Sequence, residues 1–93
     1  METVNLEIEL TIKNSQGLHA RPAAQFVRIA GRYEDCNLTV SKDELAVNGK
    51  SIMGMMMLQA GPGSTIKIVI EGEGAEDLSQ ELKELVESGF GES

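Results

Sequence analysis

The single histidine of this chain, His19, is the residue best suited to chemistry. It follows the loop-forming stretch 14–17 and is followed by Ala20, Arg21 and Pro22. A neutral imidazole offers a nucleophilic ring nitrogen at neutral pH. An arginine guanidinium is permanently charged, and its planar fork matches the oxygens of a phosphoryl group. Together these residues predict a site at which His19 accepts a phosphoryl group.

A helix is predicted to begin at His19, and its first turn should serve this site. Pro22 fits a first turn, because its missing N–H would have no intrahelical acceptor there. The first N–H groups of a helix lack intrahelical partners and favour an anion. We therefore expect the amides of Ala20 and Arg21 to bind phosphoryl oxygens. The small side chain of Ala20 should leave the approach open to a partner.

The distribution of charge also singles out this segment. The net charge is −7, yet the residues from Glu71 onward hold eight acidic residues and one lysine, so residues 1–70 are balanced. Between Lys13 and Arg32 there are four basic residues and no acid, a local excess that would attract phosphate or an acidic partner. Arg28 and Arg32 could equally form a solvated helix face. Nucleic acid is not expected, because the protein is acidic and only 3% aromatic.

Length and composition predict one small domain spanning residues 1–93. No apolar run is long enough for membrane insertion, and the start of the chain has no signal-peptide pattern. One cysteine gives no disulfide framework, and one histidine with one cysteine gives no metal-ligand set. We expect Cys36 to be a core residue, no metal or cofactor, and a reducing cytoplasm as the location.

Hydrophobic periodicity predicts seven elements in the order βαββαβα. Apolar residues alternate in the predicted strands and recur at three and four residues in the predicted helices. Residues 41–43 and 61–64 should be turns, and Gly31 and Gly89 should be left-handed helix caps. Strands are predicted over 4–12, 36–40, 45–47 and 66–70, and helices over 19–30, 52–58 and 75–86.

Polar residues at the outward strand positions predict that one face of the sheet is solvated. The fold class is therefore α+β, an open-faced β-sandwich of four mostly antiparallel strands with three helices on one face.

A second motif, Gly49-Lys50-Ser51-Ile52-Met53-Gly54, begins the predicted helix 52–58. Ser51 is a good N-cap. The helix is rich in methionine, and since a helix has one inward face, some of these side chains must be exposed. We expect Ile52 and Met53 to contribute to a flexible apolar docking patch for several partners.

The motif Gly-Leu-His-Ala-Arg-Pro-Ala at 17–23, the order βαββαβα and the motif at 49–54 together resemble HPr, the histidine-containing phosphocarrier of the bacterial phosphotransferase system. The resemblance covers the chain from Val4 to Gly89. It implies that the δ nitrogen of His19 accepts a phosphoryl group from Enzyme I, which takes it from phosphoenolpyruvate. It also implies transfer to the IIA domains of sugar permeases and phosphorylation of Ser51 by an HPr kinase. We expect a monomer that carries the group rather than a turnover enzyme.

Two other functions stay open from the sequence. The chain could serve a regulatory, nitrogen-type phosphorelay without direct sugar transport, and this alternative also uses His19. In the other, the chain is a non-phosphorylated binding module and the His19 loop is only a helix cap. Phosphorylation by phosphoenolpyruvate and Enzyme I separates the binding module from both carriers.

Overall fold

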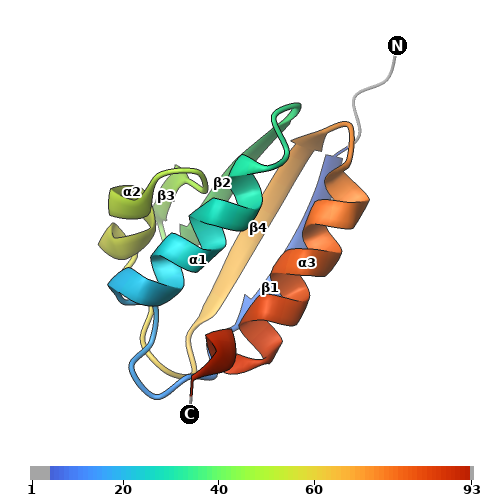
Figure 1. Cartoon of the computed structure of the whole chain (residues 1–93). Coiled ribbons are helices and arrows are strands. Elements are labelled where there is room, and N and C mark those ends of the chain that lie inside the picture. Colours follow the sequence, from blue (N-terminus) through green and yellow to red (C-terminus); the bar gives the residue numbers. More distant parts are fainter. Residues whose placement is uncertain (1–4, 93) are drawn as a thin grey trace.

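The computed structural model describes residues 5–92 as one sheet with helices packed on it (Figure 1). The seven predicted elements are present in the predicted order, followed by a short 3-10 helix, η1. Val4, the first residue of the first predicted strand, lies outside the described residues. The bounds are β1 Asn5–Thr11, α1 Ala20–Gly31, β2 Cys36–Lys42, β3 Leu45–Asn48, α2 Ile52–Met57, β4 Thr65–Gly72, α3 Ala75–Glu87 and η1 Gly89–Gly91.

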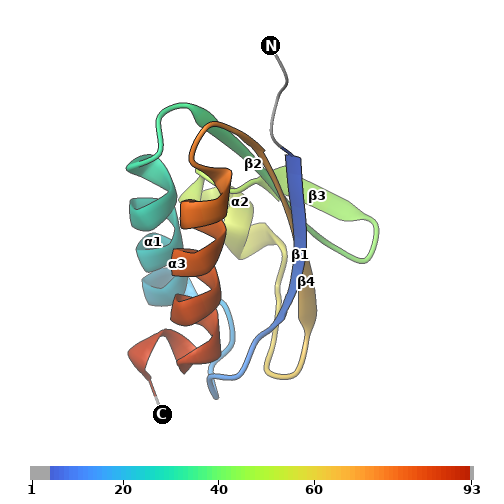
Figure 2. The same cartoon turned by 90° about the vertical axis from the view of Figure 1, so that its right-hand side faces the viewer.

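The sheet has the strand order β1-β4-β2-β3, and all three neighbouring pairs are antiparallel. Figure 2 shows the helices on one side of this sheet and no element on the other. The open face is polar: Lys67 on β4 lies 3.6 Å from the carboxylate of Glu7 on β1. The predicted open-faced α+β sandwich is confirmed.

The core lies between the sheet and the helices α1 and α3. Alternate β4 residues are fully buried, because the period-two pattern turns them toward the helices. Phe26 from α1 and Leu82 from α3 have no exposed surface. Cys36 is also fully buried, and burial raises the pKa of its thiol. The thiol donates to the carbonyl of Glu73 at 3.1 Å, which confirms Cys36 as a core residue.

Two local predictions are wrong. Gly31 is the last residue of α1 with no positive φ, and the C-cap Arg32 is right-handed. The helix ends without a left-handed cap because the amides of Arg32 and Tyr33 bond the carbonyls of Ile29 and Ala30. The hairpin turn is also displaced from 41–43, because Ser41 and Lys42 still pair with Ala46 and Leu45.

The helix α2 begins as predicted. The hydroxyl of Ser51 accepts a hydrogen bond from the amide of Gly54 at 3.0 Å, so Ser51 is the N-cap. Lys50 Nζ donates to the carbonyl of Tyr33 at 2.8 Å, and α2 packs beside α1. These contacts attach the Ser51 segment to the helix that carries His19.

Tyr33 joins the end of α1 to α3, and we expect its phenol to titrate abnormally. Its hydroxyl donates to the carboxylate of Glu81, and this bond, with burial, raises the pKa of Tyr33 to about 12. The pKa of Tyr33 in the folded protein exceeds the ordinary value of about 10. Its contribution to the free energy of unfolding is therefore fully present below pH 10 and is lost as the pH rises toward 12.

Near-ultraviolet absorbance measures this titration, because the sequence holds one tyrosine and no tryptophan. Glu81→Ala should return the midpoint toward 10, whereas Glu84→Ala, which removes the same charge from α3, should leave it unchanged. Equal midpoints in the wild type and in Glu81→Ala would contradict the assignment.

Candidate phosphoryl-acceptor site

His19 is the N-cap of α1, with extended backbone angles, and its carbonyl accepts from the amide of Ala23 at 2.9 Å. The preceding loop is fixed by close backbone packing. Gly17 has a φ of +70°, and a Cβ there would lie 2.7 Å from the carbonyl oxygen of Ala60. The amide of Leu18 donates to that same oxygen at 2.8 Å. Only glycine fits this approach without strain, so Gly17 helps to set where His19 enters the helix.

The side chain of His19 opens onto a surface hollow and is 40% exposed. The predicted site residues His19, Ala20 and Arg21 therefore lie together. Two residues of the loop before His19 and two from the C-terminal end of the chain complete the hollow. The lining residues are Ser15, Gln16, His19, Ala20, Arg21, Gly91 and Glu92.

The first turn of α1 gives this hollow a positive character. Helix geometry leaves the amides of Ala20 and Arg21 without intrahelical acceptors, and the first turn holds no acidic residue. Arg21 is exposed at the rim. Arg28 and Arg32 lie roughly 10 Å and 16 Å farther along the helix, at about 1.5 Å per residue. Arg32, just beyond α1, pairs with Glu81 at 3.6 Å, and of these three arginines Arg21 is the one that lines the hollow.

Glu92 is a site residue that the sequence interpretation missed. Its Oε1 atom lies 3.2 Å from Nε2 of His19 and 3.1 Å from Nδ2 of Asn14. Partial burial alone would raise the pKa of Glu92, but the hydrogen bonds from His19 and Asn14 and the nearby charge of Arg21 outweigh burial and lower this pKa below its ordinary value. Glu92 is therefore ionised at neutral pH, and the site is less positive than residues 13–32 alone predicted.

The contact with Glu92 assigns the protons of the His19 ring. An ionised carboxylate can only accept hydrogen bonds, so Nε2 must donate, and in the neutral ring the lone pair then belongs to Nδ1. In this arrangement Nδ1 is the ring nitrogen with a free lone pair. The sequence by itself could not choose between the two nitrogens.

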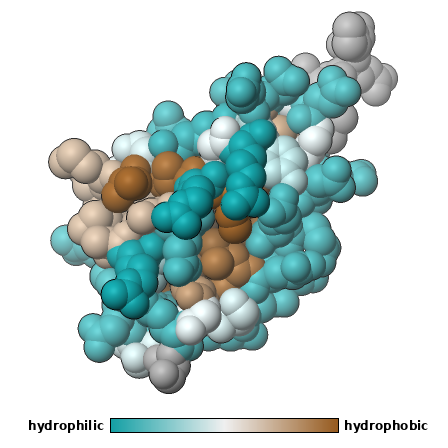
Figure 3. Space-filling view, in the orientation of Figure 1, coloured by the Kyte–Doolittle hydropathy of each residue, from teal (hydrophilic) through white to brown (hydrophobic). Residues whose placement is uncertain are grey.

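Two of the residues predicted to contact partners, Ile52 and Met53, lie on α2, and the third, Ala20, begins α1. Met53 is 76% exposed, and Ile52, Met56 and Met57 are also exposed, whereas Met55 is fully buried. Figure 3 shows apolar atoms gathered on the side of the molecule where α2 lies in Figure 1. The exposed methionines are thus identified, while their role in docking stays a prediction.

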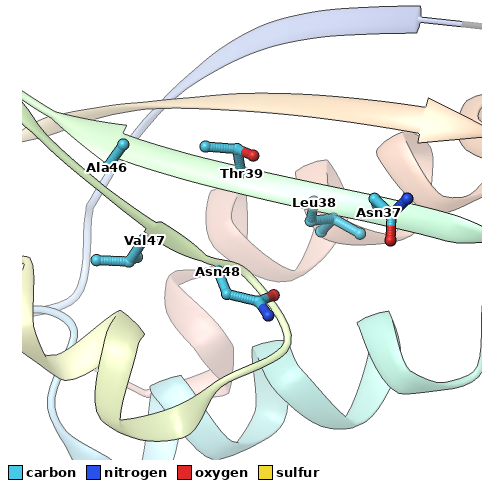
Figure 4. A pocket seen from close by; sticks show the side chains of 6 residues that line it. All are labelled: Asn37, Leu38, Thr39, Ala46, Val47 and Asn48. Atoms are coloured by element: carbon cyan, nitrogen blue, oxygen red, sulfur yellow. The ribbon is translucent and has the colours of Figure 1, made fainter.

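A second hollow lies between β2 and β3, on another part of the molecule (Figure 4). It holds no acidic or basic side chain, so it offers nothing for acid-base chemistry. Its lining residues are Asn37, Leu38, Thr39, Ala46, Val47 and Asn48.

Comparison with known proteins identifies the family. Residues 6–88 match the sequence profile of the family described as "PTS HPr component phosphorylation site". The chain belongs to the HPr family. The phosphocarrier protein HPr of Pseudomonas aeruginosa is 46% identical over 86 residues, which cover 91% of this chain and 94% of that protein. The chain is thus a member of the phosphocarrier family of the phosphotransferase system.

Solved structures of HPr share the fold. HPr of Thermoanaerobacter tengcongensis superposes with a TM-score of 0.89 at 44% identity, covering 95% of this chain and 98% of that one. HPr of Bacillus anthracis gives 0.82 at 40% identity, covering 88% and 96%. No helix within residues 5–92 has the length and apolar character needed to cross a membrane.

Proposed function

We propose that this chain, as a single domain over residues 1–93, carries a phosphoryl group on Nδ1 of His19. It receives the group from phosphorylated Enzyme I and passes it to the IIA domains of sugar permeases. The observation that carries the proposal is the contact between Nε2 of His19 and ionised Glu92, because it leaves the Nδ1 lone pair for attack.

The transfer step needs only the phosphoryl donor and the His19 ring. The Nδ1 lone pair attacks phosphorus in line, a P–N bond forms, and the bond from phosphorus to the donor breaks with its electron pair leaving on the donor. The proton on Nε2 stays in place. Passing the group to an IIA domain reverses these roles, so the protein ends unchanged and acts as a carrier rather than a turnover enzyme.

The surroundings suit temporary storage. A helix N-terminus stabilises an exposed anion by about 0.3 to 1 kcal/mol, so the amides of Ala20 and Arg21 can orient the phosphoryl oxygens without trapping them. The guanidinium of Arg21 adds charge at the rim of the hollow. The hollow is built from one chain, and we propose that the carrier works as a cytoplasmic monomer.

Incubation with phosphoenolpyruvate and a cognate Enzyme I tests this function. Mass spectrometry should find one acid-labile phosphoryl group on His19, and adding a IIA domain should remove it. A wild-type protein that stays unphosphorylated would instead fit the non-phosphorylated binding module.

We also propose that α2 provides the docking patch, formed by Ile52 and Met53 together with Ala20 of α1, and that an HPr kinase regulates docking through Ser51. The exposure of Ile52 and Met53 supports an apolar contact with partners. Ser51 lies directly before them as the N-cap of α2, so a charge on its hydroxyl would enter any interface built on this patch.

Reversing the charge of Arg21 should slow transfer while leaving the fold intact. A hydrogen bond to a charged group contributes about 1.5 to 3 kcal/mol, so Arg21→Glu should slow phosphorylation by about 10- to 100-fold. Arg21 is exposed, and its replacement should change the free energy of unfolding by less than about 1 kcal/mol. Rates of uptake and donation measure the effect.

Arg28→Glu is the matched control, since it makes the same charge change on the exposed face of the same helix. Its rates should stay close to those of the wild type. Wild-type rates for Arg21→Glu in both directions would remove Arg21 from the mechanism.

A further inference from the structure

One carboxylate oxygen of Glu92 connects the segment after α3 to two residues of the loop between β1 and α1. Oε1 of Glu92 accepts from Nδ2 of Asn14 and contacts Nε2 of His19. Asn14 is only 2% exposed, and its amide group also donates to the carbonyl of Gly17 at 2.6 Å. Both amide protons are therefore used, and the buried Asn14 side chain fixes where Oε1 lies.

The segment that carries Glu92 is itself anchored. Gly89, Phe90 and Gly91 all have positive φ, which turns the chain back from the end of α3 toward the loop after β1 (Figure 1). A positive φ is unfavourable for phenylalanine, but Phe90 is 2% exposed and packs in the core. Burial of this ring outweighs the backbone cost and holds the segment against the site.

We propose that Glu92 is a positioning residue for phosphoryl transfer, holding the His19 ring with Nδ1 unprotonated and balancing the charge that the ring acquires. This inference rests on the proposed function. When Nδ1 bonds to phosphorus, the proton on Nε2 stays and the ring becomes cationic. A carboxylate beside Nε2 stabilises that cation, as an orienting acid does for other nucleophile and base pairs.

The role of Asn14 follows from this arrangement. Because Nδ2 of Asn14 and Nε2 of His19 donate to the same oxygen, the amide keeps Oε1 in reach of the ring when a partner approaches the exposed side of the hollow. Phe90 and Asn14 thus hold Glu92 in place, and Glu92 in turn orients the His19 ring.

Two substitutions separate the charge of Glu92 from its position. Glu92→Gln keeps the shape and an acceptor oxygen but removes the charge, whereas Glu92→Ala removes both. Each should slow uptake from phosphorylated Enzyme I by about 10- to 100-fold, the range found when a carboxylate that orients a metal-bound histidine is lost. The control is Glu87→Gln, which removes the same charge at an exposed position near the end of α3.

Nitrogen NMR shifts of the single histidine supply a readout that a purely structural role would not change. In the wild type, neutral His19 should show Nε2 protonated and Nδ1 unprotonated. In Glu92→Ala the two tautomers should mix, while the control keeps the wild-type shifts. Thermal melting of each variant verifies that it is folded.

Wild-type rates in both Glu92 variants, with wild-type protein phosphorylated normally, would overturn this inference and leave the proposed function intact. Unchanged ring shifts in Glu92→Ala would overturn it as well. A wild-type protein that takes up no phosphoryl group would overturn the proposed function, and with it the role of Glu92 in transfer.

Discussion

Replacing His19 with alanine is expected to abolish phosphoryl transfer, with uptake falling below detection. The variant removes the only imidazole in the protein. The remaining nucleophile candidates are poor: Cys36 is fully buried, and the hydroxyl of Ser15 in the hollow has no histidine left to take its proton. The fold should survive, because the His19 side chain is partly exposed and forms no capping hydrogen bond.

The measurement is phosphate incorporation from phosphoenolpyruvate with Enzyme I, followed by treatment with acid. A P–N bond on His19 is acid-labile, whereas a phosphoserine ester survives, so the treatment distinguishes His19 from Ser51. His19→Gln gives a second, polar replacement and should be equally inactive. Acid-labile phosphate on either variant would show that another residue accepts the group.

Phosphorylation of Ser51 is expected to reduce uptake from Enzyme I by about 100-fold or more. It adds roughly −2 charge at the start of α2, where the free amides and the helix dipole favour an anion, so the fold should tolerate it. The same charge lies beside the exposed side chains of Ile52 and Met53. A partner that covers these residues must bury an unpaired charge, which costs about 3 to 5 kcal/mol.

The test compares the kinase-modified protein and Ser51→Asp with the wild type, by transfer rate and by thermal melting. Both should melt no lower than the wild type and accept phosphoryl groups more slowly, the modified protein by the larger factor. Ser79→Asp adds the same single charge as Ser51→Asp on α3 and should transfer at the wild-type rate. A wild-type rate for protein modified at Ser51 would contradict regulation through docking.

Local patterns in the sequence were sufficient for the architecture. Apolar residues recur with a period of two in strands and about 3.6 in helices, and these periods follow from backbone geometry alone. Ser51 could be predicted as an N-cap because capping uses an amide three residues away. The register of the hairpin was harder, since turn residues at 41–43 can also continue a strand when a partner strand is available.

The meeting of His19, Ala20 and Arg21 at one hollow could likewise be predicted, because the three residues are consecutive at a helix start. The sequence could not predict which α2 side chains are exposed, since that depends on how α2 packs against its neighbours. Met55 is buried, whereas Met53 is exposed. The right-handed end of α1 at Gly31 could not be predicted either, since it depends on hydrogen bonds from the next residues to the carbonyls of Ile29 and Ala30.

The contact between Glu92 and His19 was decided by the tertiary structure alone. The two residues are separated by 73 positions, and their meeting depends on the direction of α3, on three consecutive left-handed residues and on the burial of Phe90. The sequence showed only two glycines around a phenylalanine and an acidic tail. Local periodicity does not predict this contact, because the packing of the whole chain brings the carboxylate of Glu92 to the His19 ring. The sequence singled out His19 as the candidate nucleophile, and the fold placed the carboxylate of Glu92 beside Nε2 of its ring.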